Sequence, residues 1–519
     1  MAERPIDAPD GAEVARLRGG FQGHVLLPGE DGYDQARQVW NAMVDRRPAV
    51  IARCTSPADV AAAVGFARAH GLEVGVRCGG HSVLGLSVPE GGLMVDLSPM
   101  RSVRVDPTRR RAWVGGGALL GDLDRATQPY GLATTAGNVS HTGVGGLTLG
   151  GGMGWLARRL GLACDNVTRF QLVTAEGELL HASEQEHPDL FWGLRGGGGN
   201  FGVVTEFEFH LHQVGTAALL VDLLYAPEDA PRTLRRWREL LPDAPREATL
   251  TAWVGTTGPW SFLPPELRDR PLASVGYVWV GDPDQGRKLL PALRDGTPPP
   301  VAERVQELTY LELQTMDDEA HRHGLLRRYW KGHYLRDLGD GTIEAFLSRG
   351  DDSGGDPMLL PSGSLQSYGG MIAAVGDAET AFGHRDALVE FVAVAGWTNP
   401  AQNQARMAAA RRYGAVVEPF ASGVYVNDLT DEGQAGIRRA YHPSTLARLA
   451  GLKDRYDPGN VFRLNHNIRP ASSSHGDRPD DDHRRAGRHP PAGRTDAGTS
   501  IWIRISERSI SVTMTTSER

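Results

Sequence analysis

The sequence has few cysteines, no long apolar run and no excess of positive charge. Its 519 residues include three cysteines at unrelated spacings (Cys54, Cys78, Cys164), which indicates neither a disulfide framework nor a zinc knuckle. The 55 Lys+Arg against 63 Asp+Glu leave a net charge of -8, whereas a nucleic-acid binder needs a basic patch. No segment approaches the ~18 apolar residues of a membrane span, and residues 1–10 are polar. We therefore expect a soluble, cytoplasmic protein without nucleic-acid or membrane partners.

Several common site signatures are also missing. The chain has no Gly-Lys-Ser/Thr phosphate loop and no complete Gly-x-Ser-x-Gly nucleophile elbow. Gly197 to Gly202 match Gly-x-Gly-x-x-Gly, but a β-rich run follows where a Rossmann fold needs a helix. The pairs His210/His212 and His321/His323 stand alone, without acids or cysteines in a ligand pattern. We therefore expect no metal site.

Glycine is what the sequence has in excess, with 65 residues, about an eighth of the chain against a usual ~7%. The glycines are clustered, most densely between residues 143 and 154. Glycine lets the backbone adopt positive φ and approach a ligand closely, so that consecutive amides can face an anion. A single cluster is most simply a tight turn. Several clusters in one domain favour a dinucleotide whose pyrophosphate lies on bare backbone.

The local pattern predicts an α+β arrangement in the first part of the chain. Residues 49–53 form a β-rich run, and Ser56 followed by Pro57 reads as a helix N-cap with proline at the first position. The spacing then predicts a helix that ends at Gly71 and a strand over 72–77. Further strands are expected at 93–97, 111–114, 170–174 and 202–210, and a helix at 118–130. Beyond residue 470 the composition becomes too polar to order itself, except for a strand-like run at 501–505.

Four separated motifs occur in one order along the chain. They are Arg77-Cys78-Gly79-Gly80-His81-Ser82; the run 143–155 leading into 161–166; Asp189 to Arg195 before four glycines; and Tyr425-Val426-Asn427 followed by Lys453 to Phe462. Over residues 30–470 the sequence resembles the berberine bridge enzyme-like branch of the vanillyl-alcohol oxidase (PCMH-type) flavoproteins, in particular the bacterial FAD-linked oxidases.

The resemblance implies a discontinuous PCMH-type FAD-binding domain and an antiparallel-sheet substrate domain with flanking helices. We expect the FAD-binding domain at 1–213, with a core from about residue 44, and the substrate domain at 214–420. A berberine-bridge-like segment at 421–470 returns to the FAD-binding domain. We expect residues 471–519 to form a disordered tail.

The resemblance also implies that His81 is joined covalently to FAD. A neutral imidazole can add to the flavin's dimethylbenzene edge, and Gly79-Gly80 leaves room for the ring beside the backbone. Relatives with a second bond use a cysteine where this chain has Val139, so we expect a single linkage. The residues expected to bind the cofactor are Arg77, Gly79, Gly80, His81, Ser82, Gly137, Asn138, Ser140, His141, Gly145, Gly146, Gly150, Gly152, Gly154, Trp155, Asp165, Gly202, Val203, Val204, Tyr425, Asn427, Asn465 and Asn467.

The catalytic base departs from the family pattern. Many relatives carry Tyr-x-Asn-Tyr near the C-terminus, whereas this chain reads Tyr-Val-Asn followed by Asp428. A carboxylate in a partly desolvated pocket has a raised pKa and can act as a general base; alternatively, Asp428 is solvated, pairs with an arginine or caps a turn. Tyr329, Tyr334 and His333, on one expected strand of the substrate domain, are further candidates.

The resemblance therefore predicts an FAD-dependent oxidase that takes hydride from an alcohol, sugar, amine or secondary-metabolite C–H, with dioxygen as acceptor and hydrogen peroxide as product. Two alternatives stay open. One is a dehydrogenase of the same architecture that passes electrons to a quinone or a protein. The other is a flavin-binding protein without catalysis, which the missing tyrosine makes conceivable. The sequence names neither the substrate nor the oligomeric state.

Overall fold

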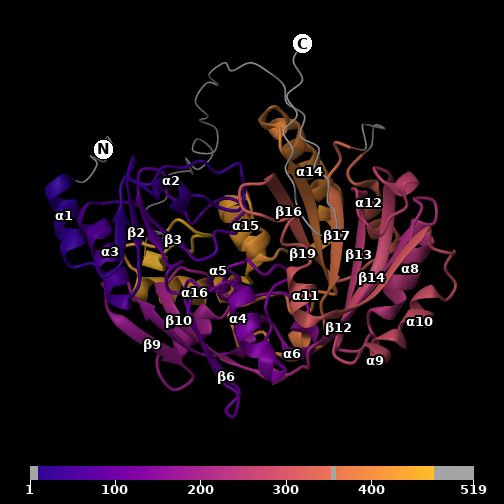
Figure 1. Cartoon of the computed structure of the whole chain (residues 1–519), viewed down its shortest axis with the longest axis horizontal. Coiled ribbons are helices and arrows are strands. Elements are labelled where there is room, and N and C mark those ends of the chain that lie inside the picture. Colours follow the sequence, from indigo (N-terminus) through magenta and orange to yellow (C-terminus); the bar gives the residue numbers. More distant parts are fainter. Residues whose placement is uncertain (1–9, 352–357, 473–519) are drawn as a thin grey trace.

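The computed structural model describes residues 10–351 and 358–472. Of the expected tail 471–519, all but residues 471 and 472 lie outside the described residues, including the strand-like run at 501–505. The chain forms two halves that lie side by side (Figure 1). One half contains the residues before about 213 together with the C-terminal helices, and the other is built around one large sheet. The α+β fold class is confirmed. None of the helices within these ranges is long and apolar enough to cross a bilayer.

A small sheet opens the first half and ends beside the future site. Its strand order is β1-β2-β4-β3, with β2, β4 and β3 parallel and β1 antiparallel to β2. The strands are β1 (His24–Leu26), β2 (Val50–Arg53), β3 (Val74–Arg77) and β4 (Leu93–Asp96). The helices are α1 (Gly11–Gly19), α2 (Tyr33–Ala36) and α3 (Pro57–Ala69). Ser56 caps α3, with its side chain accepting from the Asp59 amide at 3.2 Å, as the Ser-Pro pattern predicts.

The second sheet of this half is antiparallel, in the order β5-β6-β10-β8-β9. Its strands are β5 (Val103–Asp106), β6 (Arg111–Gly115), β8 (Val167–Val173), β9 (Leu179–Ser183) and β10 (Val203–His210), and a short ribbon pairs β7 (Leu132–Ala133) with β11 (His212–Gln213). The helices of this part are α4 (Leu120–Thr127), α5 (Val144–Leu149), α6 (Ala157–Leu160) and α7 (Pro188–Leu194), with 3-10 turns at Gln128–Tyr130 and Ala163–Asn166. The helix expected over 118–130 is therefore an α-helix that tightens into a 3-10 turn at its end.

The second half is an eight-stranded sheet in the order β15-β12-β14-β13-β17-β18-β16-β19, antiparallel throughout. The strands are β12 (Ala217–Tyr225), β13 (Ala248–Thr256), β14 (Pro271–Val280), β15 (Ala302–Thr309), β16 (Arg327–Leu335), β17 (Ser362–Ser367), β18 (Val389–Trp397) and β19 (Ala421–Gly423). The helices are α8 (Ala230–Leu240), α9 (Pro283–Arg287), α10 (Leu290–Arg294), α11 (Tyr310–Thr315), α12 (Asp340–Ser348), α13 (Met371–Ala374) and α14 (Asn403–Val417).

Helices cover one face of this large sheet, and its other face is turned toward the first half of the molecule. α8, α12 and α14 bury side chains of the sheet in one core, which includes Trp237, Phe346 and Tyr413. On the other face, the register pairs Gln366 of β17 with Glu390 of β18, and Glu390 with Tyr334 of β16. These three polar residues therefore form one row across the sheet, because directly opposed residues of an antiparallel pair share a face.

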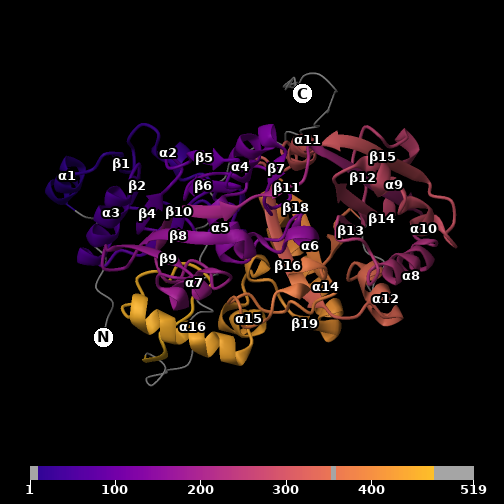
Figure 2. The ribbon, with the colours of Figure 1, turned by 90° about the horizontal axis from the view of Figure 1, so that it is seen from below.

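The chain returns to the first half after residue 423. Helices α15 (Gly433–Ala440) and α16 (Pro443–Tyr456) lie below the β8 and β9 strands and α7 (Figure 2). Leu449 and Leu452 of α16 are buried in the same core as Phe191 and Phe201. Lys453 is fully buried and donates to Asp457 Oδ2 at 2.7 Å and to the carbonyls of Asn200 and Phe462, both at 2.8 Å. These contacts fix the C-terminal segment against the glycine-rich loops.

Candidate active site

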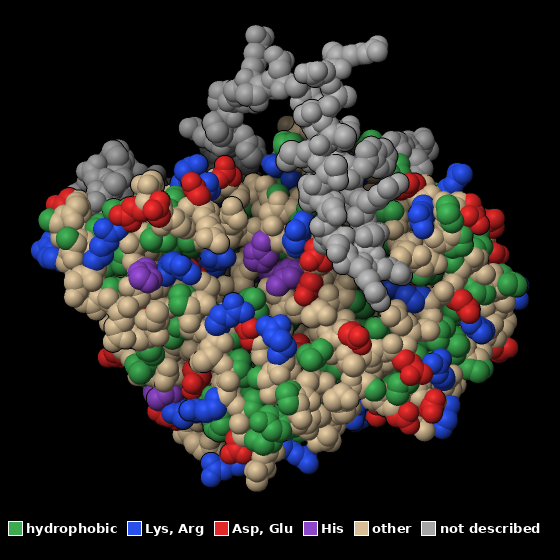
Figure 3. All heavy atoms as spheres, in the orientation of Figure 1, with side chains coloured by type: hydrophobic (Ala, Val, Ile, Leu, Met, Phe, Trp, Pro, Cys, Tyr) green, Lys and Arg blue, Asp and Glu red, His purple; other side chains and the backbone are tan. Residues whose placement is uncertain are grey.

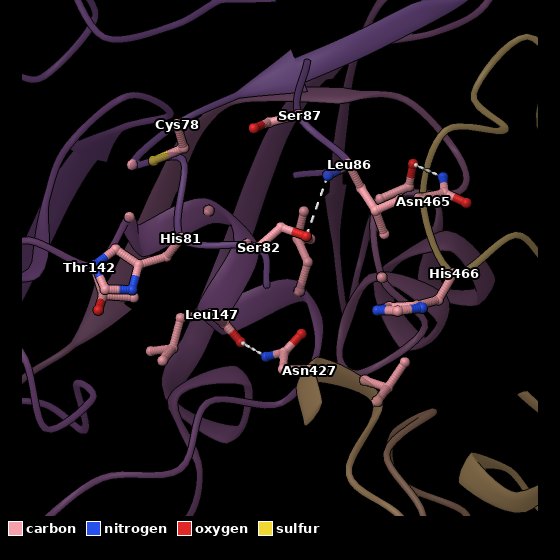
Figure 4. Close-up of a pocket in the computed structure, with 18 of the residues that line it drawn as sticks. Cys78, His81, Ser82, Leu86, Ser87, Thr142, Leu147, Asn427, Asn465 and His466 are labelled. Carbon is pink, nitrogen blue, oxygen red and sulfur yellow. Dashed lines mark hydrogen bonds between the residues drawn. The ribbon is translucent and has the colours of Figure 1, made fainter. Parts of the chain in front are cut away.

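A cavity of about 450 Å³ lies where the two halves meet. The loop after β3, the glycine-rich segments and β10 supply one wall; β16, β17 and β18 of the large sheet supply another, and the C-terminal segment closes it. Figure 4 shows side chains from these distant segments converging, among them His81, Asn427 and Asn465. The cavity thus brings together parts of three of the four motifs that lie far apart in the sequence, and the remaining motif, Asp189 to Arg195, is represented only by the glycine run that follows it.

Glycine is required around the cavity for two different reasons. At Gly79 and Gly143 a side chain would overlap the backbone of the other residue, so the two loops can only approach as glycines. Gly146 and Gly199 line the cavity with no atom within 4 Å of where a Cβ would stand. Backbone without side chains therefore borders open space, as a ligand in close contact with main-chain amides requires.

His81 lies on the loop that follows β3, and its neighbours fix its ring. Gly80 before it has φ +68°, a conformation that favours glycine. The Trp40 indole stacks on the His81 ring at 4.6 Å with an interplanar angle of 17°. Asn41 Nδ2 donates to the carbonyls of Val83 at 2.6 Å and Arg328 at 3.0 Å, which ties this loop to β16. The imidazole is therefore held at the boundary of the two halves.

Two further histidines surround His81. Its Nε2 and His141 Nδ1 are 2.7 Å apart, and ring nitrogens of His81, His141 and His323 lie within 4.8 Å of one another. Burial lowers the pKa of all three, that of His81 well below its usual value and that of His323 to about 4. All three are therefore neutral at pH 7. Figure 3 shows histidines at the centre of one face of the molecule.

A pair of buried carboxyl groups faces the cavity from the other side. Glu390 comes from β18, and Asp428 from the 3-10 turn Val426–Asp428 that follows β19. The two groups hydrogen-bond each other. Glu390 also accepts from the Tyr368 hydroxyl at 3.4 Å. Because carboxylates only accept, the bond between them needs a proton on one of them.

Glu390 carries this proton. Burial and the neighbouring Asp428 raise the pKa of Glu390 well above its usual value. Burial also raises the pKa of Asp428, to about 6, while the hydrogen bond from Glu390 opposes that rise. At neutral pH the pair therefore consists of a neutral Glu390 that donates to an ionised Asp428, and Asp428 is poised to accept a proton.

Tyr425 and Asn427 join the C-terminal segment to the glycine-rich run. The Tyr425 hydroxyl accepts from the Gly152 amide and from Asn427 Nδ2, both at 2.8 Å, and Asn427 Nδ2 also donates to the Leu147 carbonyl at 3.3 Å (Figure 4). Asn465 Nδ2 donates to the carbonyls of Gly199 at 3.1 Å and Phe462 at 3.0 Å. Both asparagines line the cavity with their amides held in place.

The structure brings most of the expected cofactor residues to this cavity. Those that line it are Gly79, Gly80, His81, Ser82, Gly137, Asn138, Gly145, Gly146, Gly202, Val203, Val204, Tyr425, Asn427 and Asn465. Val139 also lines it, at the position where relatives with two linkages carry cysteine. Cys78 lines it too, but burial raises the pKa of its thiol to about 11. Cys164 is fully buried away from the cavity lining.

The other expected cofactor residues do not line the cavity. Arg77 donates to the Ala36 carbonyl at 2.6 Å. Ser140 Oγ donates to Asp318 at 2.6 Å, and Asp165 binds the guanidinium of Arg385 at 2.7 Å. Each of these polar side chains therefore forms a hydrogen bond with a protein group rather than facing the cavity.

The remaining glycines of the run serve packing rather than the cavity wall. A side chain on Gly150 would overlap Asn427, one on Gly152 would overlap Ala163, and one on Gly154 would overlap the Ala136 carbonyl. Three further residues do not line the cavity. His141 shares a hydrogen bond with His81. The backbone carbonyl of Trp155 accepts from Thr249 Oγ1, and that of Asn467 accepts from Gln434 Nε2.

The three aromatic candidates on β16 do not line the cavity. The Tyr329 hydroxyl donates to Asp431 at 2.6 Å, and His333 bonds the Gly414 carbonyl at 2.9 Å and Arg439 at 2.8 Å, both on the helix-covered face. Strand side chains alternate, so Trp330 takes the cavity face instead. Tyr334 shares that face but is buried behind the wall, with its hydroxyl 3.3 Å from that of Tyr368.

The side chains that the large sheet contributes to the cavity were not predicted from the sequence. Trp330, Gln366 and Glu390 line the cavity, as does Trp40 from the N-terminal segment. Glu390 had one usable signal, an acid inside the apolar run Leu388 to Trp397, where an isolated charge is costly unless it has a function.

Buried polar atoms without a hydrogen-bond partner show whether the cavity suits a large polar ligand. Among described residues that line the cavity, the buried atoms Asn138 Oδ1, Trp330 Nε1, Gln366 Nε2 and Asn465 Oδ1 have no hydrogen-bond partner. Such atoms are rare in a protein interior and call for a ligand or water. Together with the bare glycine backbone, they fit a dinucleotide with a polar ring system.

Comparisons with known proteins agree with this geometry. Residues 48–183 match the family model of an FAD binding domain, and residues 424–469 match the berberine and berberine like family. The (R)-6-hydroxynicotine oxidase of Paenarthrobacter nicotinovorans is 31% identical over 463 residues, which are 87% of this chain and 98% of that protein. An uncharacterised FAD-linked oxidoreductase of Bacillus subtilis is 29% identical over 461 residues, 86% of this chain and 98% of that protein.

Solved structures show the same fold. The crystal structure of 6-hydroxy-D-nicotine oxidase from Arthrobacter nicotinovorans has a TM-score of 0.76 at 30% identity and covers 87% of this chain and 98% of that one. A xylooligosaccharide oxidase from Myceliophthora thermophila has a TM-score of 0.77 at 22% identity, over 89% and 99% of the two chains. The two family matches and the 31% identity over nearly the whole length of an oxidase show that the chain belongs to the berberine bridge enzyme-like family of FAD-linked oxidoreductases.

Proposed function

We propose that this protein is an oxidase that binds FAD covalently through His81 and oxidises a small molecule at a C–H that bears a hydroxyl or an amine. When bound, FAD supplies the two-electron acceptor, and dioxygen is the proposed final acceptor, giving hydrogen peroxide. One observation carries the proposal: His81 and the Glu390–Asp428 pair line the same cavity. His81 belongs to its glycine-rich side, and the carboxyl pair belongs to the side that we assign to the substrate.

The carboxyl pair gives the reaction its proton acceptor. Oxidation of an alcohol or an amine releases the proton of the hydroxyl or the nitrogen. A general base removes this proton best when its pKa lies near the pH at which the enzyme works. Asp428 lines the cavity, and its pKa is raised by burial to about 6. Glu390 holds Asp428 in place through the shared proton. The Gln366 amide and Trp330 indole offer donors that would orient the substrate.

Anaerobic mixing tests the proposal. A panel of alcohols, sugars, secondary amines and aromatic metabolites is added to the purified protein without oxygen. We expect at least one donor to bleach the yellow absorbance, and admission of air to restore the colour with one hydrogen peroxide per turnover. Recovery with a quinone or dye but not with air would make the protein a dehydrogenase. No bleaching by any donor would leave a flavin-binding protein and contradict the proposal.

The charges that line the cavity predict a selectivity between donors. Among the described lining residues, none is a lysine or an arginine, and Asp428 is ionised at neutral pH. A carboxylate placed about 8 Å from Asp428 would be repelled by about 2 kcal/mol at an effective dielectric of ~20, roughly thirty-fold in binding. We therefore expect anionic donors to show a raised KM relative to neutral or cationic analogues of the same shape.

The measurement compares kcat/KM for a neutral donor and its carboxylated analogue in the wild type and in Asp428→Asn. The asparagine keeps the shape of the side chain but removes the charge, so the discrimination should shrink while the absolute rate falls. Equal discrimination in both proteins would show that Asp428 does not set the electrostatics of the cavity.

A further inference from the structure

His81 and His141 are joined by a hydrogen bond between one defined nitrogen of each ring. The two rings come from loops 60 residues apart, and each faces the other with one nitrogen, His81 Nε2 and His141 Nδ1, at 2.7 Å. Trp40 stacks on the His81 ring and fixes its plane. Nδ1 of His81 makes no hydrogen bond with any described residue, and His81 lines the cavity. Its free nitrogen is thus the one available to a ligand.

The shared proton decides which nitrogen of His81 is nucleophilic. A hydrogen bond between two imidazole nitrogens holds one proton, and both rings are neutral. With the proton on His81 Nε2, His81 Nδ1 carries a lone pair, and His141 Nδ1 is the acceptor. After Nδ1 of His81 has been alkylated, Nε2 of a neutral ring carries only a lone pair, so His141 must then be the donor. Attachment of a ligand through Nδ1 therefore requires the proton to pass from His81 to His141.

We propose that His141 is the positioning residue for attachment of FAD: it holds His81 in the Nδ1-nucleophilic tautomer and takes the Nε2 proton as the bond forms. The inference rests on the proposed function. The new bond joins His81 Nδ1 to the methyl carbon at the flavin's dimethylbenzene edge. That carbon loses a proton, and the electron pair of the broken C–H bond stays on the flavin. Dioxygen then removes the two electrons and, with the two released protons, becomes hydrogen peroxide.

His141 is suited to the attached state. Its Nε2 is buried and has no partner among the described residues. An unpaired buried lone pair costs less than a buried N–H without an acceptor, and Nε2 becomes such a lone pair once His141 donates through Nδ1.

The same three histidines also fit the donor set of a transition metal, since their ring nitrogens lie within 4.8 Å of one another. In a metal site, however, the ligand nitrogens point at the ion. Here His81 and His141 point their facing nitrogens at each other at hydrogen-bond distance. The geometry therefore favours a proton between the two rings.

The experiment measures how much of the purified protein carries FAD after denaturation, by intact mass, in the wild type, His81→Ala, His141→Ala, His141→Gln and His323→Asn. His323→Asn is the matched control, because His323 lies in the same cluster without a hydrogen bond to His81. We expect complete attachment in the wild type and His323→Asn, and none in His81→Ala. In both His141 variants, at least tenfold less should be attached, while FAD remains bound without a covalent bond and imidazole in the buffer restores attachment.

The FAD released by acid from the His141 variants shows in the same sample that they fold and bind the cofactor. Attachment at the wild-type level in both His141 variants would overturn the inference and leave the proposed function intact. A wild type that holds FAD without any bond would overturn the attachment step itself, and a wild type without FAD would overturn the proposed function as a whole.

Discussion

Replacing Asp428 by asparagine should lower kcat/KM by about a hundredfold or more, the range of a lost general base. Asp428 is buried at 6% exposure, faces the cavity and is the ionised member of the carboxyl pair. Asparagine keeps the volume and can still bond Glu390, but it cannot take a proton. Steady-state kinetics with any donor found by anaerobic bleaching, together with the rate of flavin reduction, measure the loss.

Glu390→Gln is the matched control, because glutamine keeps a neutral donor toward Asp428. We expect it to lose less than about tenfold in kcat/KM. The wild-type rate should rise with pH through about 6, since Asp428 accepts the substrate proton only when it is ionised, and this limb should vanish in Asp428→Asn. If Glu390→Gln were the inactive variant and Asp428→Asn the active one, the roles of the two carboxyls would be reversed.

Replacing Arg385 by methionine should lower the free energy of unfolding by about 3–5 kcal/mol, the cost of leaving a buried charge unpaired. The side chains of Arg385 and Asp165 are 2% and 7% exposed. Arg385 donates to both oxygens of Asp165, at 3.0 and 2.7 Å, and to Thr380 Oγ1 at 2.7 Å. The pair joins the segment before β18 to the 3-10 turn Ala163–Asn166, so its loss should loosen both halves.

The matched control is Arg336→Met, which breaks the pair with Asp386, whose side chains are 48% and 57% exposed. An exposed pair contributes about 0–1 kcal/mol, so this variant should unfold close to the wild type. Urea denaturation followed by tryptophan fluorescence compares the variants. Equal midpoints for Arg385→Met and Arg336→Met would show that the buried pair does not stabilise the fold.

Local rules explain why much of the first half could be predicted. The N-cap at Ser56, the helix that follows it and the strands before the glycine loops depend on neighbours within a few residues. The motif around His81 could be interpreted for the same reason. Gly79 and Gly80 were expected to leave room for the flavin ring, whereas the structure shows that Gly79 lets its loop approach the backbone of Gly143, a contact that the sequence did not indicate.

The substrate side of the cavity depends on long-range pairing instead. Glu390 faces Gln366 and Tyr334 only because of the register of three antiparallel strands, which no local pattern specifies. The candidates on β16 illustrate the point: a difference of one residue along the strand separates Tyr329, on the helix-covered face, from Trp330, on the cavity face. Asp165 was expected at the cofactor, but it binds Arg385 instead, a partner 220 residues away that no local pattern indicates.

The central claim is that this cavity holds FAD fixed to His81. The most direct test is the visible spectrum of the freshly purified protein together with its intact mass after acid denaturation. We predict a yellow pellet, a colourless supernatant and a single mass increased by one FAD, all of which disappear in His81→Ala. A colourless pellet under a yellow supernatant would contradict the bond, and a colourless protein with the mass of the bare chain would contradict the account.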